Sequence, residues 1–462
     1  MRYPAIIFCS RSRSRISLLF IYLITLLLLV LTNKKSNCQA MSTPSTASGR
    51  RPTLRKISST VSSISNDDSS DDHDATAKKR VQKMVQHSKE GTPLTDEEVQ
   101  DICNSIQNLV PTDAPIDFGE LKELLKSVAH LSHKDWGVTS DNSEKLSSLL
   151  SVGSKDDNDG ESLSPHARQL LERILTEGNW FGAVKSAPPM NSPKRKPWAV
   201  LVTGVNGIRK TTSMYQPWFD SLLSEALCSP PDVDVANKPK NLPTGSNSFF
   251  RQLDHMICTL TNEEFAKLYH WAASQLPSDG SPSEQLVQDY SDYKAAIFTR
   301  YRTLSELLGG LLLREAQKVN MNCLMETSGR DVAMFHYVDH FFDSTKYNKL
   351  AVHFTINDLE CAKLSVDRRM IQEIQEGVKA VKSEDVFDII YANAGGPYGS
   401  QVLEGVQKDS DKVWETEVLS GNVGSDWYKA SIMINAHATE PWTAQAVKPD
   451  GSLGTEFTFE RR

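Results

Sequence analysis

The chain has 462 residues, of which 39% are hydrophobic and 24% are charged, and its formal net charge at pH 7 is -7. This length allows about two or three domains, and the hydrophobic content allows at least one of them to bury a core. General nucleic-acid binders are usually basic, so the acidic balance argues against nucleic acid as a partner.

The seven cysteines are spread along the chain without a C-x-x-C pair. This spacing is a poor framework for disulfides and a poor zinc site. We therefore expect free thiols, which suit a reducing compartment.

Near its start the chain has an apolar run at residues 17–32, with arginines before it and lysines after it. A membrane-spanning helix needs about 20 apolar residues, whereas the core of a signal peptide needs about 7–15. The run falls between these lengths. We therefore expect residues 1–40 to be a signal peptide cleaved after Ala40 or a retained membrane anchor. Membrane contact is expected only through residues 17–32.

Residues 41–91 follow this leader, and no acidic residue precedes Asp67. A basic, Ser/Thr-rich and acid-poor stretch is typical of a transit peptide. Behind a signal sequence it resembles the two-part leaders of proteins sent to plastids bounded by extra membranes. The alternative is a disordered linker behind a membrane anchor. The expected location is accordingly a plastid, or else a membrane-anchored position in the endomembrane system.

Residues 92–190 are expected to form a small helical region. Thr95 and Glu98 make a capping box, after which apolar residues recur at helical spacing. Two further helices are expected at residues 118–131 and 165–176.

Beyond residue 190 the pattern changes to alternating strands and helices. Apolar runs that predict buried parallel strands occur at residues 198–203, 322–325, 349–356 and 386–392. Amphipathic stretches that predict helices occur at residues 293–319, 332–342 and 359–378. This alternation predicts an α/β fold over residues 191–462, with a parallel sheet and helices on both faces. A ligand is expected at the carboxyl ends of the strands. Three tryptophans in the last 60 residues indicate a packed segment there.

A phosphate-binding loop is expected directly after the first of these strands. Its residues are Gly204, Val205, Asn206, Gly207, Ile208, Arg209, Lys210, Thr211 and Thr212. In such loops successive backbone N–H groups surround a phosphate, a lysine reaches the outer phosphates and the next hydroxyl binds magnesium. The strand and the register together predict a sheet of the P-loop NTPase type that binds a nucleoside triphosphate and Mg²⁺, with Lys210 on the phosphates and Thr211 on the metal. We take the nucleotide to be ATP, and GTP stays open as the alternative. The alternative is a strand-to-helix turn that binds nothing.

Two features depart from the usual loop pattern. Arg209 stands where the second glycine is required, so its side chain either crowds the nucleotide or adds a cation to it. Pro217 removes a helix hydrogen bond, and we expect it to kink or end the following helix early.

The strand at residues 322–325 runs into Glu326-Thr327-Ser328-Gly329-Arg330. Together with the phosphate loop, this order of parts resembles the zeta-toxin family of P-loop kinases over roughly residues 196–395. In that family a strand ending in Glu-x-Thr follows a long helix, and a later helix carries arginines that close over the phosphates. Arg368 and Arg369 occupy the corresponding helix here.

The resemblance implies a kinase that transfers the γ-phosphate of ATP to a hydroxyl of a small metabolite or nucleotide sugar. Its partners would be the nucleotide and this small-molecule acceptor. For such a reaction we expect Lys210 on the phosphates and either Asp254 or Glu326 as the group that activates the acceptor hydroxyl. Arg330, Arg368 or Arg369 would neutralise charge in the transition state.

One departure from the family pattern concerns the general base. Asn247 or Ser248 falls where the family has an aspartate, and neither accepts a proton as a carboxylate does. Asp254 either substitutes or the base is lost, while Arg251 is a candidate ligand for a substrate phosphate. A pseudokinase-like nucleotide-binding protein and an NTPase acting on water therefore stay open as alternatives. The glycine-rich loop at residues 393–399 is either a plain turn or a loop that lies against the nucleotide base, with Tyr398 stacking on it.

Overall fold

The computed structural model describes residues 94–460 except 110–116, 129–134, 152–164, 189–194, 231–238, 240, 278–279, 384, 394 and 438–440. The leader at residues 1–40 and the linker at residues 41–91 lie outside these residues, so their signal-peptide and transit-peptide interpretations stay predictions. In the described part of the chain, no helix combines the length and apolar character that a membrane span requires.

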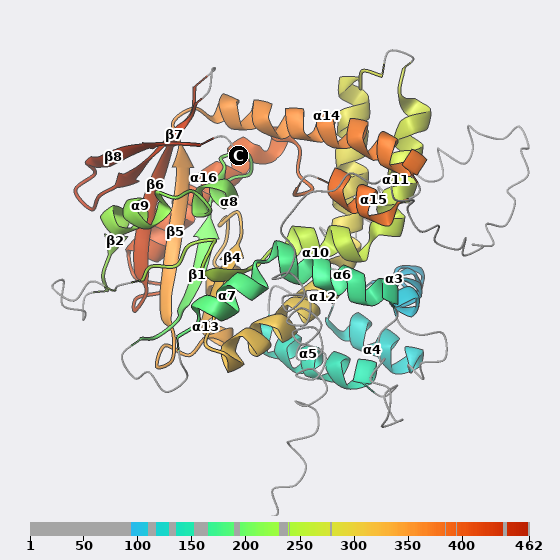
Figure 1. Cartoon of the computed structure of the whole chain (residues 1–462), viewed down its shortest axis with the longest axis horizontal. Helices are drawn as coiled ribbons and strands as arrows, with labels where there is room; N and C mark the ends of the chain where they lie inside the picture. The colour runs from blue at the N-terminus through green and yellow to red at the C-terminus, as the bar shows by residue number, and fades with distance from the viewer. Residues whose placement is uncertain are drawn as a thin grey trace, which may run out of the picture. The chain divides into compact units, whose positions relative to one another are not determined.

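The structure contains an eight-stranded mixed sheet, which lies on the left in Figure 1. Its strands are β1 (Trp198–Thr203), β2 (Leu227–Cys228), β3 (Ser248–Arg251), β4 (Asn322–Glu326), β5 (Asn348–Ile356), β6 (Tyr428–Asn435), β7 (Thr443–Val447) and β8 (Leu453–Thr458). The order is β3-β4-β1-β5-β6-β7-β8, and β2 pairs with β6. The pairs from β3 to β6 are parallel, whereas β7, β8 and β2 join antiparallel.

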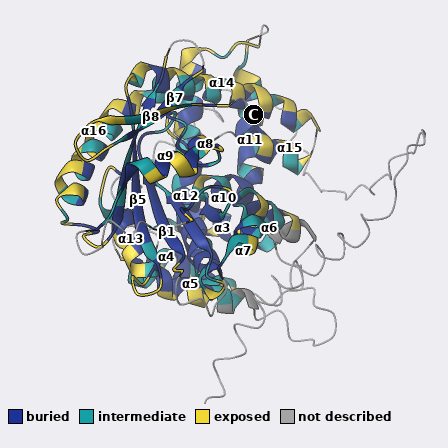
Figure 2. Ribbon diagram, turned by 60° about the vertical axis from the view of Figure 1, so that its left-hand side comes forward, coloured by how far each residue is buried: buried dark blue, intermediate teal, exposed yellow. Residues whose placement is uncertain are grey.

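The position of β1 fixes where a ligand is expected. After β1 the chain forms β3 and β4 on one side of it, and then β5 and β6 on the other side. This reversal is a topological switch point, and in open α/β sheets ligands bind outside the carboxyl ends of the strands at such a point. All six residues of β1 are buried, so both faces of the sheet are covered at its centre, as Figure 2 shows. The predicted α/β class is confirmed.

The helices fall into three groups along the chain. The first group is α3 (Asp96–Leu109), α4 (Phe118–Val128), α5 (Trp136–Ser151), α6 (Pro165–Glu177) and α7 (Trp180–Ser186). The second is α8 (Lys210–Met214), α9 (Phe219–Ala226), α10 (Leu253–Leu260), α11 (Asn262–Gln275) and α12 (Glu284–Lys318). The third is α13 (Ala333–Phe341), α14 (Leu359–Ser383), α15 (Val386–Ala392) and α16 (Leu403–Val413), with the 3-10 helix η2 (Ser400–Val402) before α16 and the π-helix η3 (Trp414–Leu419) after it.

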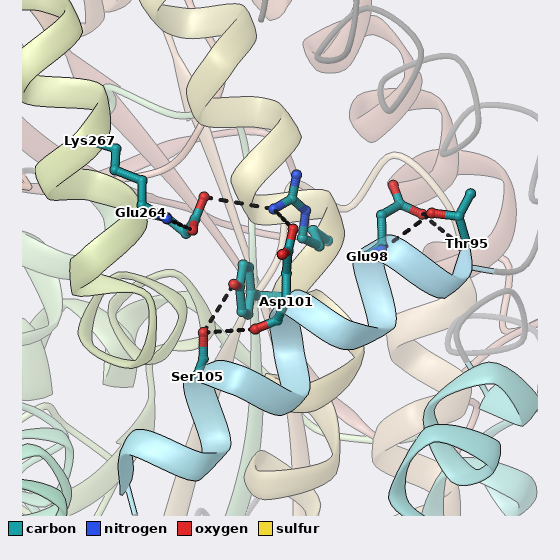
Figure 3. A network of polar contacts seen from close by, with 8 residues as sticks. Thr95, Glu98, Asp101, Ser105, Glu264 and Lys267 are labelled. Carbon is teal, nitrogen blue, oxygen red and sulfur yellow. Dashed lines mark hydrogen bonds and ion pairs between the residues drawn. The ribbon is translucent and has the colours of Figure 1, made fainter. Parts of the chain in front are cut away.

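The helical region packs on α12 and α11 through a polar network shown in Figure 3. The capping box of α3 is confirmed, because the Thr95 backbone N–H donates to Glu98 at 2.8 Å and the Glu98 N–H donates to the Thr95 hydroxyl at 3.3 Å. Arg300 of α12 bonds Asp101 of α3 at 3.0 Å and lies 3.7 Å from Glu264 of α11. Apolar side chains of α3 and α4 share a core with those of α10, α11, α12 and α14.

Several sequence predictions of individual elements are confirmed. The strands predicted at residues 198–203, 322–325 and 349–356 are β1, β4 and β5. The helix after the phosphate loop ends at Met214, before Pro217, and a new helix starts at Phe219. In the C-terminal segment Trp414, Trp427 and Trp442 are buried, as expected of packed chain.

Other predictions were wrong, each for an identifiable reason. Residues 386–392 form the helix α15 and not a strand, because the Asp385 side chain caps it by accepting from the Phe387 N–H at 2.8 Å. A short apolar run has too few residues for its period to separate helix from strand. The long helix begins at Glu284 rather than near Tyr293, with Ser283 as its N-cap. Helices α5, α7, α9, α10, α11 and α16 and strands β2, β3, β6, β7 and β8 were not predicted.

We expect Gly377→Ala to destabilise the protein by about 1–3 kcal/mol, because a Cβ at Gly377 of α14 would overlap the Tyr269 ring. The matched control is Gly405→Ala in α16, where a Cβ meets nothing within 4 Å. There the higher helix propensity of alanine predicts a gain of about 1 kcal/mol. Urea unfolding measures both changes, and a stable Gly377→Ala variant would contradict the tight packing of α14 on α11.

Candidate functional site

The predicted phosphate loop connects β1 to α8 at the centre of the sheet. Gly204 and Gly207 have φ angles of 126° and 85°, which L side chains rarely adopt. A Cβ at Gly204 would lie 2.5 Å from the carbonyl oxygen of Phe354, and one at Gly207 would lie 2.6 Å from that of Ala362. Both glycines are therefore required, one by β5 and the other by α14.

Arg209 occupies the position of the missing glycine in a left-handed conformation, with φ at 64°. The guanidinium carbon lies 4.2 Å from the Trp442 ring centroid and 5.3 Å from that of Phe459. Such cation–π contacts stabilise by about 0.5–1 kcal/mol or more each, which offsets part of the backbone strain. Trp442 precedes β7 and Phe459 follows β8, so the C-terminal strands support the loop.

Three side chains meet at the start of α8. Lys210 is buried; its ammonium donates to the carbonyl oxygen of Val205 at 2.7 Å and lies 3.2 Å from a carboxylate oxygen of Glu326. The Thr211 hydroxyl donates to the other carboxylate oxygen of Glu326 at 2.8 Å. Burial lowers the pKa of Lys210, and the charge of Glu326 opposes that shift. Glu326 reaches this place because it is paired with Val202 in the β1–β4 register.

Asp254 lies in the first turn of α10, just beyond the carboxyl end of β3. Its side chain keeps access to solvent, although protein groups surround it closely enough to remove part of its hydration. This desolvation raises the pKa of Asp254, the charge of Glu326 raises it further, and nearby arginines and a lysine act in the opposite direction. A carboxylate with a raised pKa at this edge of the sheet suits a general base.

The predicted arginines are placed differently from one another. Arg369 is close enough to Lys210 and Asp254 to act on the pKa of both. Arg368, its neighbour on α14, is exposed, as is Arg330 in the turn after β4. The sequence predicted arginines on this turn of α14 correctly. Successive helix residues point in directions about 100° apart, and the structure brings Arg369 rather than Arg368 to the site.

Asn247 and Ser248 lie at the amino end of β3, away from the phosphate loop. The Asn247 side chain accepts from the Thr244 N–H at 2.9 Å and donates to the Leu242 carbonyl at 2.9 Å, so it shapes the turn before the strand. Arg251 is no phosphate ligand either, because it is buried in an ion pair with Glu306 at 2.6 Å. Asp254 is the carboxylate that the fold brings to the site from this segment.

The glycine-rich loop at residues 393–399 follows α15 and reaches the same site. A Cβ at Gly396 would lie 2.8 Å from a carboxylate oxygen of Asp254 and 3.1 Å from the side-chain amide nitrogen of Asn206. A Cβ at Gly395 would lie 2.8 Å from the Arg369 guanidinium. Gly395 has a φ angle of 145°, which favours glycine, and Gly396 borders both the phosphate loop and Asp254. The stacking of Tyr398 on a base stays a prediction.

A cavity of about 850 Å³ lies elsewhere, beyond the far end of α8. Its lining includes Lys185, Arg195, Tyr215 and Asn247, and no residue from Gly204 to Arg209. The polar cluster at the phosphate loop, rather than this cavity, carries the chemistry predicted from the sequence.

Replacing Arg209 separates its backbone conformation from its side-chain contacts. Both Arg209→Gly and Arg209→Ala lose the stacking on Trp442, but only alanine keeps the left-handed strain. We therefore expect the glycine variant to be more stable by about 1 kcal/mol. The control is the exposed helical position Arg368, where Arg368→Ala is expected to be more stable than Arg368→Gly by about 1 kcal/mol. Equal stability of the two Arg209 variants in urea unfolding would contradict the strained loop.

Asp254→Asn is expected to stabilise the protein near neutral pH. Because the pKa of Asp254 is higher in the folded state, the wild type loses stability as pH rises from the unfolded pKa through the folded pKa. Asparagine cannot ionise, so the variant does not lose this stability. Its higher free energy of unfolding relative to wild type should disappear at about pH 3–4, where Asp254 is protonated in both states. The control is Asp409→Asn on the exposed surface of α16, which should change little. An asparagine variant less stable than wild type near neutral pH would contradict the desolvation of Asp254.

No protein-family model matches the chain, and no curated protein matches its sequence. Among solved structures, the chain is similar to the crystal structure of AvrRxo1-ORF1:AvrRxo1-ORF2 with sulphate ions. The identity is 11%, the TM-score is 0.24, and the match covers 64% of this chain and 71% of that chain.

Proposed function

We propose that the chain is an ATP-dependent phosphotransferase of the P-loop kinase type. It would transfer the γ-phosphate to a hydroxyl of a small metabolite or nucleotide sugar. The observation that carries this proposal is the convergence of Lys210, Thr211 and Glu326 at the switch point of the sheet, beside Asp254. The order of motifs, which resembles the zeta-toxin kinases, supports the same function.

The residues present fit a Mg²⁺–nucleotide complex. Magnesium is usually held by one or two protein oxygen ligands together with phosphate oxygens and water. The Thr211 hydroxyl and the Glu326 carboxylate are 2.8 Å apart and offer that donor set. Across the described residues, no group of three or more His, Cys, Asp and Glu side chains is arranged to hold a metal by itself. Bound magnesium would neutralise phosphate charge at this place.

Lys210 must exchange partners when the nucleotide binds. It now donates to Val205 and pairs with Glu326, and its burial makes an unpaired charge costly. Phosphate oxygens would replace the Val205 carbonyl as acceptors, while Glu326 keeps the lysine charged. Arg369 would add a second cation beside the transferred group.

In the proposed reaction Asp254 accepts the proton of the acceptor hydroxyl. The hydroxyl oxygen forms a bond to the γ-phosphorus, and the bond from that phosphorus to the bridging oxygen breaks to release ADP. Most of the rate enhancement in such reactions comes from positioning and charge neutralisation. The raised pKa of Asp254 makes it a stronger base than an ordinary aspartate.

Nucleotide binding without transfer is the second candidate function. The close approach of Gly396 to both Asn206 and Asp254 favours it, because an acceptor would need the same space. ATP consumption that depends on an added acceptor hydroxyl separates transfer from binding alone, and consumption without an acceptor indicates hydrolysis by water.

Mg²⁺–ATP is expected to raise the melting temperature of the wild type. At a concentration of about 100 times Kd, binding adds about 2.7 kcal/mol to the free energy of unfolding. Lys210→Ala should abolish this shift, whereas Lys318→Ala, an exposed lysine at the end of α12, should keep it. Wild-type melting unchanged by millimolar Mg²⁺–ATP would refute the proposed function, and so would an undiminished shift in Lys210→Ala.

A further inference from the structure

The glycine segment, which we define as Gly395, Gly396 and Pro397, lies over the candidate site. A Cβ added at Gly396 would lie 2.8 Å from an Asp254 carboxylate oxygen and 3.1 Å from the side-chain nitrogen of Asn206 in the phosphate loop, so Gly396 borders both side chains. In the proposed reaction the acceptor hydroxyl binds at Asp254 and the γ-phosphate beside the phosphate loop. The segment therefore occupies space that the proposed reaction needs.

Helix α12 bonds Asn393, which precedes this segment, and Pro397, which ends it. On one side, the Lys294 ammonium donates to the side-chain oxygen of Asn393 at 3.0 Å. On the other side, the Ser291 hydroxyl donates to the carbonyl oxygen of Pro397 at 3.3 Å. Ser291 and Lys294 lie on the same side of α12 because they are three residues apart in a helix.

Lys294 is itself held rigidly by buried groups. It is fully buried, and it contacts the two carboxylate oxygens of Glu373 at 2.8 and 2.7 Å. The Tyr290 hydroxyl donates to Glu373 at 2.6 Å. Glu373 belongs to α14, the helix that carries Arg369 and packs on Gly207. Figure 1 shows α14 running from the sheet to α11 and α15. The buried ion pair between Lys294 and Glu373 joins α12 to α14, and Lys294 also bonds Asn393 just before the glycine segment.

We propose that Lys294 and Ser291 are positioning residues that hold the glycine segment closed over the phosphate loop and Asp254. Nucleotide and acceptor then reach the site only after the segment moves. This closure rests on the proposed function, because it controls access to the same site. With closure of this kind, the observed association rate of a nucleotide is the intrinsic rate multiplied by the fraction of molecules that are open.

The test releases the segment without leaving a buried charge unpaired. Ser291→Ala combined with Asn393→Ala removes both anchors but keeps the Lys294–Glu373 ion pair, whose disruption is strongly destabilising. Asn393→Asp retains an oxygen acceptor for Lys294 and is the conservative variant. Asn422→Ala is the control, because Asn422 hydrogen-bonds within an exposed turn next to η3.

Two measurements are made on the full chain. Hydrogen–deuterium exchange without nucleotide is expected to be faster in the double variant for the backbone amides of residues 395, 396, 398, 399 and 204–209. Stopped-flow binding of a fluorescent ATP analogue with Mg²⁺ is expected to show an association rate about tenfold higher, since two hydrogen bonds that favour the closed state are lost. Asn393→Asp and Asn422→Ala should behave as the wild type does.

The outcomes separate this inference from the proposed function. Unchanged exchange in the double variant would overturn the anchoring role of Lys294 and Ser291. Faster exchange with an unchanged association rate would overturn closure and leave the proposed function standing. Absence of analogue binding in every variant, including those that exchange faster, would overturn the proposed function and with it the closure that rests on it.

Discussion

Glu326 is the residue on which the geometry of the candidate site depends. Its carboxylate binds both Lys210 and Thr211, so the end of β4 is joined to the first turn of the helix that follows the phosphate loop. The parallel register of β1 and β4 brings it there, and the buried lysine makes the contact obligatory, because a buried ammonium without a counter-charge would lose its proton or destabilise the fold. The same carboxylate raises the pKa of Asp254. One side chain thus orders the lysine, the candidate metal ligands and the candidate base.

The phosphate loop is also supported by elements other than β4. Its glycines are packed against β5 and α14, and its one strained residue, Arg209, is stacked on aromatic residues beside the C-terminal strands. A loop with arginine at this position therefore needs β7 and β8, whereas a loop with glycine would need no such support. The C-terminal segment, for which the sequence offered no chemistry, has a structural role in the site.

The sequence predicted correctly those elements that are determined by residues close to one another in the chain. The strand before Gly204, the capping box at Thr95 and the helix break before Pro217 are all set by neighbouring residues, and all are present. The sequence missed what depends on distant partners. Strands β6 to β8 owe their place to pairing with β5 and with one another, and the choice of Arg369 over Arg368 depends on how α14 faces the loop. Arg251 had the right charge for a phosphate ligand, but its partner Glu306 lies on α12, which no local pattern reveals.

A crystal structure of the full chain with Mg²⁺ and a non-hydrolysable ATP analogue tests the central claim most directly. The account predicts the β-phosphate within hydrogen-bond distance of the backbone N–H groups from Gly207 to Lys210. It also predicts magnesium between Thr211 and Glu326, and the Lys210 ammonium moved from the Val205 carbonyl to a phosphate oxygen. An analogue bound away from the loop, with Lys210 still bonded to Val205, would contradict it.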